Sequence, residues 1–163
     1  MAKHRADIAN FAVRIFLQEI GAAYDQERGF SPYTKGKHFK EIQRFFGDMC
    51  CYCGGTPAKW VQDHLVPMNR TALGLEAWGN VVPACDGCNS KKQAHNWRDF
   101  IIQRAGDQVA ERHARMHQYL AKYPYDPKLD LRDVTETLYD EVGAIAMTLI
   151  DAKLKRLRPK ITA

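Results

Sequence analysis

Two pairs of cysteines with the same spacing constrain the fold of this chain more than any other feature. Cys50 and Cys53 form one C-x-x-C pair in MCCYCGG, and Cys85 and Cys88 form the other in CDGCN. Each pair can hold one tetrahedral ion from a tight turn, and four thiolates make a closed structural zinc site. The 31 residues between the pairs, positions 54–84, exceed the about 15 to 20 of an ordinary zinc ribbon, so a further element must lie inside the frame.

The fifth cysteine, Cys51, is left over, because using it in place of Cys50 would give a cramped C-x-C spacing. We expect it to be a small buried or half-exposed residue. An odd number of cysteines, all between positions 50 and 88, in a chain without an evident export signal favours a metal over disulfides. A redox role is the alternative, but one pair would suffice for it and no βαβ pattern accompanies either pair.

The composition is that of one globular domain. The chain has 163 residues, 45% of them apolar and 26% charged, and a chain of this length buries roughly 70% of its unfolded surface on folding. No apolar run approaches the roughly 20 residues that span a bilayer, so we expect no membrane association and a cytoplasmic location. The 24 lysines and arginines exceed the 19 acidic residues, and the net charge of +5 favours polyanionic partners without requiring them.

The pattern of apolar residues divides the chain into three regions. Positions 1–48 predict two helices, with stops at Gly21 and Gly47 and a loop, SPYTKGK, between them. In positions 49–100 the helical period disappears, and the short apolar runs WVQDHLVP and NVVPAC predict two strands. Positions 101–163 form a further helical extension. We therefore expect an α+β fold in which a small two-stranded core is flanked by helices at both ends, together one compact domain.

Two long helical segments are predicted after the strands. The first runs from about Ser90 to Tyr123 with a bend near Gly106, and the second begins at a capping residue, Asp130, and stops at Pro159. Six apolar residues of the second segment follow one another at helical spacing: Leu131, Val134, Leu138, Val142, Ile145 and Leu149. This stripe can pack on the core or pair two subunits. We favour packing within the chain, and hence a monomer over a homodimer, because single domains usually need such helices to cover their cores.

The element inside the cysteine frame carries an acid next to an imidazole. Asp63 and His64 stand near the end of the WVQDHLVP strand, where burying either group without a partner is expensive. Asn80 opens the second strand, Asn89 follows the last cysteine, and Lys92 comes three residues later. The order D-H, then N, then C-x-x-C-N-x-x-K resembles the HNH endonuclease family, in the version whose ββα-metal motif is braced by a four-cysteine zinc site. The resemblance covers about a third of the chain.

The resemblance implies a role for each matching residue. Asp63 corresponds to the carboxylate that binds the catalytic divalent ion, and Asn89 corresponds to the second protein ligand of that ion. His64 corresponds to the general base that takes a proton from the attacking water, a task that suits an imidazole near neutral pH. Asn80 corresponds to the residue that ties down the loop between the strands and so fixes the histidine.

The cofactors, the substrate and the activity follow from the same resemblance. The four cysteines would hold a structural zinc ion, and the catalytic ion would be Mg²⁺ or Mn²⁺, which oxygen ligands suit. The expected activity is hydrolysis of phosphodiester bonds in DNA, with RNA as an alternative substrate. Lys91 and Lys92 are expected to contact phosphate.

Two other functions stay open for the same residues. A zinc-stabilised module that holds nucleic acid without cutting it would need the cysteines, but the presence of Asp63, His64 and Asn89 argues against it. A subunit of a larger restriction or phage complex, without independent cleavage, would account for flanking helices that match no recognition module. For a D-H pair alone, a structural imidazole and a turn-capping aspartate would be the simpler explanation, and it is the order of the other motif residues that favours the nuclease.

The remaining histidines carry weaker signals. His95 lies on the segment after the last cysteine and is an alternative to Asn89 as the final motif residue, but Asn89 has the better register. His113 and His117 lie one helical turn apart without a third ligand nearby, which favours a helix-surface or packing role. Trp97 is expected to anchor the helix of the motif on the core.

Overall fold

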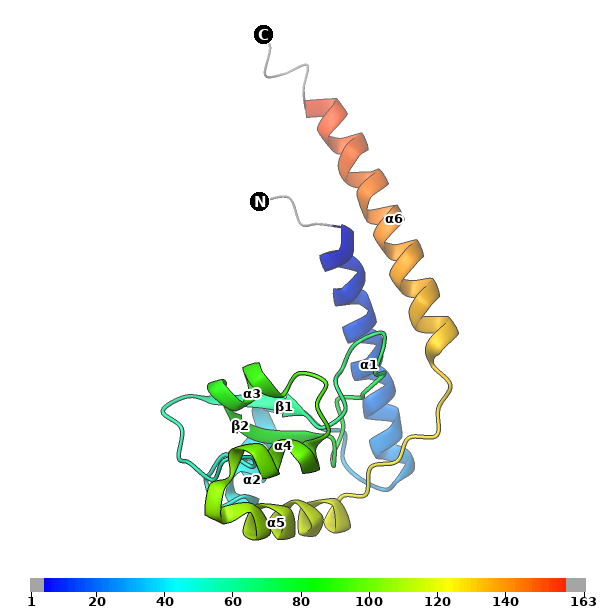
Figure 1. Cartoon of the computed structure of the whole chain (residues 1–163). Helices are drawn as coiled ribbons and strands as arrows, with labels where there is room; N and C mark the ends of the chain where they lie inside the picture. The colour runs from blue at the N-terminus through cyan, green and yellow to red at the C-terminus, as the bar shows by residue number, and fades with distance from the viewer. Residues whose placement is uncertain (1–4, 158–163) are drawn as a thin grey trace.

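The computed structural model describes the backbone of residues 5–157 and the side chains of residues 5–152. Pro159, the predicted stop of the last helix, lies outside the described residues. Helices surround one short β-hairpin (Figure 1). The elements in chain order are α1 (Arg5–Glu27), α2 (Lys35–Phe45), β1 (Trp60–His64), β2 (Val81–Cys85), α3 (Asp86–Lys92), α4 (Trp97–Arg104), the 3-10 turn η1 (Gly106–Gln108), α5 (Val109–Lys122) and α6 (Arg132–Leu157). Helices combined with a small two-stranded sheet agree with the expected α+β class. Within residues 5–157, no helix combines the length and the apolar character needed to cross a bilayer.

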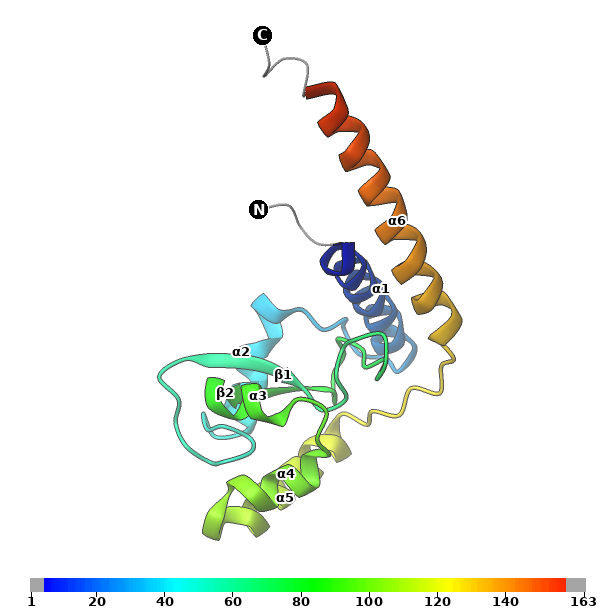
Figure 2. The same cartoon turned by 45° about the horizontal axis from the view of Figure 1, so that its top comes forward.

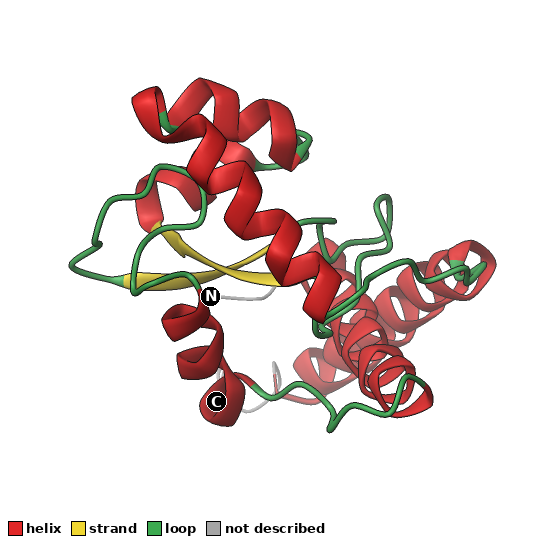
Figure 3. Ribbon diagram, turned by 90° about the horizontal axis from the view of Figure 1, so that it is seen from below, coloured by secondary structure: helices red, strands yellow, loops and turns green. Residues whose placement is uncertain are grey.

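The two strands form where the sequence predicts them, as an antiparallel hairpin. Trp60 pairs with Cys85 at one end of the ladder, and His64 pairs with Val81 at the other. Four of the five residues of β2 are buried, whereas every residue of β1 is half-buried. Figure 3 shows the two strands with helices on both sides. β1 is therefore the strand whose side chains can serve both the core and an open site.

Helix α1 is longer than predicted, because Gly21 does not stop it. Gly21 lies inside the helix where the loop before β2 crosses it, and a Cβ there would stand 2.4 Å from the carbonyl oxygen of Glu76. The glycine is thus required for close packing, and the helix ends before Gly29, whose φ of 78° is left-handed. Gly47, with a φ of 69°, follows the end of α2 as predicted. α2 begins at Lys35, inside the segment predicted as a loop.

The single bent helix predicted from Ser90 to Tyr123 is three helices. Gln93 has a φ of 44° and ends α3, and Gly106 has a φ of 53° between α4 and α5, near the predicted bend. Asn96 opens α4, since its side chain accepts a hydrogen bond from the backbone of Arg98. Trp97, in the first turn of α4, is buried in the core as expected.

The hydrophobic side chains form two clusters that define two parts of the molecule. The larger cluster lies between the hairpin, α2, α4 and α5; we call this part the body. The smaller cluster combines residues of α1 and of the loop before β2, and Leu138 and Tyr139 of α6 pack against it. Its buried members are Val13, Leu17, Met68, Leu75 and Ala77. Helices α1 and α6 run antiparallel side by side and project from the body, and we call them the arm (Figures 1 and 2).

One buried carboxylate fixes the arm to the body. Asp25, in the last turns of α1, is fully buried and accepts hydrogen bonds from the backbone N–H groups of Tyr33 at 2.9 Å and Trp78 at 3.2 Å. Arg28 pairs with the same carboxylate at 2.6 Å. Burial raises the pKa of Asp25, and these donors oppose that rise. The junction is therefore a fully bonded polar contact and not only apolar packing.

The apolar stripe predicted for the last helix is only half correct. Leu131 and Leu138 pack against the smaller cluster and Val142 is half-buried, whereas Val134, Ile145 and Leu149 are 47%, 57% and 65% exposed. α6 instead approaches α1 through a small residue, Gly143, where an added Cβ would stand 3.4 Å from the Cβ of Ala9. The face that packs is therefore rotated from the predicted stripe toward the smaller residues.

Candidate functional site

The four paired cysteines come together at one end of the hairpin. Their Sγ atoms all lie within 4.8 Å of one another, and this is the one such group of potential metal ligands within the described residues. Cys50 and Cys53 lie in the turn before β1, Cys85 ends β2 and Cys88 lies in the first turn of α3. Four thiols at this separation suit tetrahedral coordination of an ion such as zinc, with bonds of about 2.3 Å. The cluster can therefore hold a metal ion such as zinc.

Local hydrogen bonds shape the two turns of the cluster. The backbone N–H of Cys50 donates to the carbonyl of Gly55 at 2.9 Å, and that of Gly54 donates to the carbonyl of Cys50 at 3.0 Å. The N–H of Cys88 donates to the Sγ of Cys85 at 3.4 Å, so this thiol caps α3. Hydrogen bonds from Cys51 and then Cys88 hold the pKa of Cys50 well below its usual range.

Cys51 stays outside the cluster, which confirms the prediction. It is fully buried, its N–H donates to the carbonyl of Pro83 at 2.9 Å, and burial raises the pKa of its thiol. All five cysteines are free of disulfides. Sequence reasoning missed Arg104 beside this cluster, at the end of α4, where a hydrogen bond with Cys88 raises the pKa of the guanidinium. A fixed cation at this position favours thiolates.

The carboxylate of Asp63, on β1, is held by two hydrogen bonds. The hydroxyl of Tyr52 donates to Oδ2 at 2.6 Å, and the backbone N–H of His64 donates to Oδ1 at 2.8 Å. Burial raises the pKa of Asp63, and the charge of Lys92, whose Nζ lies 3.9 Å from Oδ2, opposes that rise. Tyr52 lies between Cys50 and Cys53 in the sequence, so the turn that carries these two cysteines also positions the Asp63 carboxylate.

Lys92 is buried, whereas the sequence predicts a lysine that contacts phosphate. Its side chain is fully buried, and Nζ donates to the carbonyls of His64 at 2.9 Å and Leu65 at 3.2 Å. A phosphate cannot reach an ammonium in this position, so the expected phosphate contact is wrong. Lys92 instead fixes the backbone at the end of β1 and faces Asp63. Lys91 is exposed on α3, and its phosphate contact stays a prediction.

Asn80 closes the loop that follows His64. Its buried side chain accepts a hydrogen bond from the N–H of Val66 at 2.7 Å and donates to the carbonyls of Val66 at 3.0 Å and Leu75 at 2.7 Å. Its own carbonyl accepts from the N–H of Leu65 at 2.8 Å. Beyond the end of the two strands, the side-chain amide of Asn80 thus makes the hydrogen bonds that a neighbouring strand would otherwise make.

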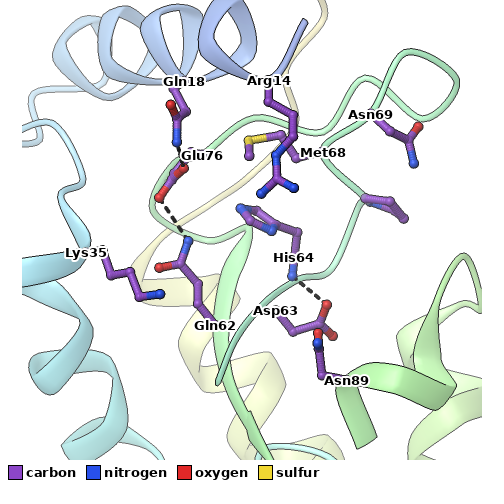
Figure 4. Close-up of a pocket in the computed structure, with 11 residues that line it drawn as sticks. Arg14, Gln18, Lys35, Gln62, Asp63, His64, Met68, Asn69, Glu76 and Asn89 are labelled. Carbon is purple, nitrogen blue, oxygen red and sulfur yellow. Dashed lines mark hydrogen bonds between the residues drawn. The ribbon is translucent and has the colours of Figure 1, made fainter. Parts of the chain in front are cut away.

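His64, Asp63 and Asn89 meet in a pocket of about 420 Å³ (Figure 4). The pocket is lined by Arg14, Gln18, Lys35, Gln62, Asp63, His64, Pro67, Met68, Asn69, Glu76 and Asn89. Asn89 reaches it from α3 and lies beside Asp63, whereas Asn80 does not line it. The structure therefore brings together three of the four residues assigned to the nuclease site and places the fourth behind them.

The imidazole of His64 is kept neutral and unpaired. Its Nε2 is buried and has no hydrogen-bond partner among the described residues. Burial lowers the pKa of His64 to about 4, with Glu76 opposing the shift and Arg14 and Lys92 adding to it. At pH 7 the ring is therefore uncharged, and it can accept a proton.

Part of the pocket comes from outside the hairpin. Gln18 of α1 donates to Glu76 Oε2 at 2.6 Å, and Gln62 of β1 donates to Oε1 of the same carboxylate at 2.9 Å. Tyr33 in turn donates to Gln62 at 2.9 Å. This chain of hydrogen bonds ties α1, the loop and β1 into one wall. No local motif signals it, since its members are spread over positions 18–76.

The other histidines stay apart from this site. His113 lies 3.0 Å from the carbonyl of Arg98 through Nε2, and the rings of His113 and His117 pack edge-on against Trp97. His95 is exposed on one side and stacks on Phe100. These contacts agree with packing roles.

A comparison with protein-family models, curated proteins and solved structures finds no match. The case for a function therefore rests on the geometry of this chain.

Proposed function

We propose that this protein is a metal-dependent endonuclease of the HNH type, which hydrolyses phosphodiester bonds in DNA. One observation carries the proposal: a neutral, unpaired His64 imidazole shares an open pocket with Asp63 and Asn89. The order of the residues along the chain supports it, because the acid and base end one strand and the amide lies on the helix that follows the other strand. The four-cysteine cluster supports it as a structural brace at the other end of the same hairpin.

The pocket offers oxygen donors that would suit a catalytic divalent ion. Asp63 would contribute carboxylate oxygen and Asn89 its amide oxygen, the donors that Mg²⁺ and Mn²⁺ prefer. No hydrogen bond of the Asn89 side chain is found within residues 5–152, and the oxygens of Asp63 keep lone pairs beyond the donors already bound. When bound, the ion would offset the charge that develops on the phosphorane and on the departing oxygen.

The residues of the chain supply the proton transfer and the positioning. His64 takes the proton of the attacking water, a contribution worth about 10²- to 10⁴-fold in rate for a well-placed general base. Because its pKa is lowered to about 4, the ring is available as a base at every pH from about 5 upward. Lys92 binds the carbonyl of His64 and Asn80 binds the backbone of Val66, two residues later, so the ring needs little reorganisation before it reacts.

The test is cleavage of supercoiled plasmid by the zinc-loaded protein with Mg²⁺ or Mn²⁺, with EDTA added briefly as the negative control. We expect cleavage with either ion and none with EDTA. One site holds one scissile phosphate, so an open-circular product should precede the linear one, in agreement with a monomer. Direct conversion to linear DNA at limiting enzyme, together with a dimeric mass, would contradict the monomer.

Further substrates separate this proposal from its rivals. Methylated plasmid, single-stranded DNA and RNA should be tested in parallel, because the pocket itself does not distinguish them. A protein with full zinc content that binds DNA but cuts none of these substrates would be a binding module or a subunit of a larger complex, and the nuclease proposal would then be wrong.

A further inference from the structure

We infer that the helices outside the hairpin supply the phosphate-binding side of this site: Arg14 of α1 and Lys35 of α2 bind phosphates of the nucleic acid, and the binding surface continues from His64 along α1. This inference rests on the proposed function. It goes beyond the motif, whose own lysine, Lys92, is buried and already bonded to two carbonyls.

The charged side chains of the pocket fall into two sets. In the first set, every charged group already has partners: Asp63 is bound by Tyr52, and each carboxylate oxygen of Glu76 accepts from a glutamine. In the second set are Arg14 and Lys35, for which no hydrogen bond or ion pair is found within the part of the chain that the structure describes. Two permanent cations without an acidic partner facing one pocket predict an anionic ligand.

The two cations reach the pocket from different helices. Figure 4 shows the guanidinium of Arg14 directed at the ring of His64, which lies between Arg14 and the Asp63 and Asn89 pair. Lys35 reaches in from α2, toward Gln62. A phosphate over His64 would therefore meet Arg14 on the side away from the Asp63 carboxylate. The planar guanidinium can bind two phosphate oxygens at once, and the ammonium acts as a point charge.

Arg14 also joins the pocket to two further hollows. One, of about 440 Å³, runs along α1 past the exposed side chains of Phe11 and Ile15. The other, of about 290 Å³, lies between α1 and the loop at Met68 to Arg70. Arg14 is the one residue that lines all three. A polymer that passes over His64 thus has a continuous path along α1, which a single small anion would not need.

The binding test uses Arg14→Ala and Lys35→Ala, each in a His64→Ala background that prevents cutting. The probe is a short fluorescein-labelled DNA duplex, followed by anisotropy over a range of salt concentrations. We expect each substitution to weaken binding about tenfold and to lower the slope of log K against log salt by about one, since each removes one phosphate contact. Both side chains are exposed, so the urea midpoint should not change.

Two matched controls remove the same charge elsewhere. Lys128→Ala changes a surface lysine in the segment before α6, and Lys40→Ala changes an exposed lysine on α2 that does not line the pocket. Both should bind the duplex within about twofold of the parent protein, because a loss of net charge alone has a small effect on a local contact. If the controls weaken binding as much as Arg14→Ala and Lys35→Ala do, the effect is one of net charge and the inference is wrong.

The cleavage test uses the otherwise unchanged protein. Arg14→Ala should slow plasmid cleavage about 100-fold, and Arg14→Lys should recover part of that loss, since it retains the charge but not the bidentate fork. Zinc content should be the same in all variants.

The two failures are distinguishable. If the unchanged protein cuts DNA and Arg14→Ala cuts and binds like Lys128→Ala, the inference is wrong while the nuclease proposal stands. If the unchanged protein binds the duplex without cutting it and Arg14→Ala weakens that binding, the nuclease proposal is wrong while the phosphate-binding surface stands. If the unchanged protein neither cuts nor binds nucleic acid, both are wrong.

Discussion

The hairpin, which is part of the body, and the arm are stabilised by different kinds of interaction. The hairpin has two strands of five residues, and the helix α3 that follows it has seven, so these elements are too short to be stable alone. They depend on clustered cysteines and on buried polar side chains with several partners each. The arm consists of helices of 23 and 26 residues that meet along small and apolar side chains and leave large apolar residues exposed. Single substitutions should therefore cost much more in the hairpin than in the arm.

The largest effect is expected from loss of the cysteine cluster. Cys50→Ser should release the zinc and unfold the hairpin, because binding of a structural zinc contributes on the order of 10 kcal/mol to folding in small domains. Cys51→Ser is the matched control, one residue away and equally buried, and it should keep one zinc per chain. Zinc content and thermal unfolding measure both. The assignment is overturned if Cys51→Ser releases the metal and Cys50→Ser keeps it.

A smaller but still large effect is expected at Asn80. Replacement by alanine leaves one N–H and two carbonyls of the loop without their partner, so unfolding should become easier by about 3 kcal/mol. Asn10→Ala, on the exposed face of α1, should change stability by about 0.5 kcal/mol or less. Urea titration of both variants compares hairpin and arm directly, and equal midpoints would contradict the comparison.

Two helical glycines differ in how tightly they are packed: Gly21 lies where the arm meets the body, and Gly143 lies where the arm projects. Gly21→Ala places a Cβ 2.4 Å from a backbone carbonyl, which should destabilise the protein by about 2 kcal/mol. Gly143→Ala meets mainly the flexible side chain of Arg5, at 3.0 Å, and gains helix propensity, so it should be neutral within about 0.5 kcal/mol. Thermal unfolding of the pair is the measurement. Equal losses of stability in the two variants would mean that the projecting part of the arm is packed as tightly as its junction with the body.

The smallest effect is expected from the titration of His64. Its pKa is about 4 in the folded chain and near 6.5 in the unfolded one, so below pH 6.5 the unfolded state binds more protons. The stabilisation is complete above pH 6.5 and is lost as the pH falls toward 4. His64→Asn should remove this dependence, which amounts to about 1 kcal/mol between pH 7 and pH 5.5. Urea midpoints at the two values test it; parallel losses in both proteins would assign the acid sensitivity to other groups.

Local chemistry made the hairpin predictable from the sequence. Cysteine spacing and short apolar runs placed both strands and separated Cys51 from the cluster, because metal geometry and strand length are properties of a few neighbouring residues. The break at Gln93 was missed, and so was the continuation of α1 through Gly21, which depends on a tertiary contact. Gly21 in particular behaves as a packing residue because of the backbone of Glu76, more than 50 positions away.

The site was predictable only where it lies within the hairpin and the helix α3 after it. Asp63, His64 and Asn89 share a pocket, but the buried position of Lys92 follows from two carbonyls that the sequence cannot place. Arg14 and Lys35 carried no local signal, because they reach the pocket from separate helices. What decides their role is which charges find partners after folding, and that is a property of the assembled structure.

One matched pair of variants tests whether DNA is cut at the His64 pocket. His64→Ala and His113→Ala each remove one imidazole, the first from the pocket and the second from the face of α5 that packs on Trp97. Plasmid cleavage with Mg²⁺ should fall by about 10²- to 10⁴-fold in His64→Ala, with zinc content and duplex binding unchanged, and should stay near the parent rate in His113→Ala. Cleavage by His64→Ala at nearly the parent rate would contradict the account.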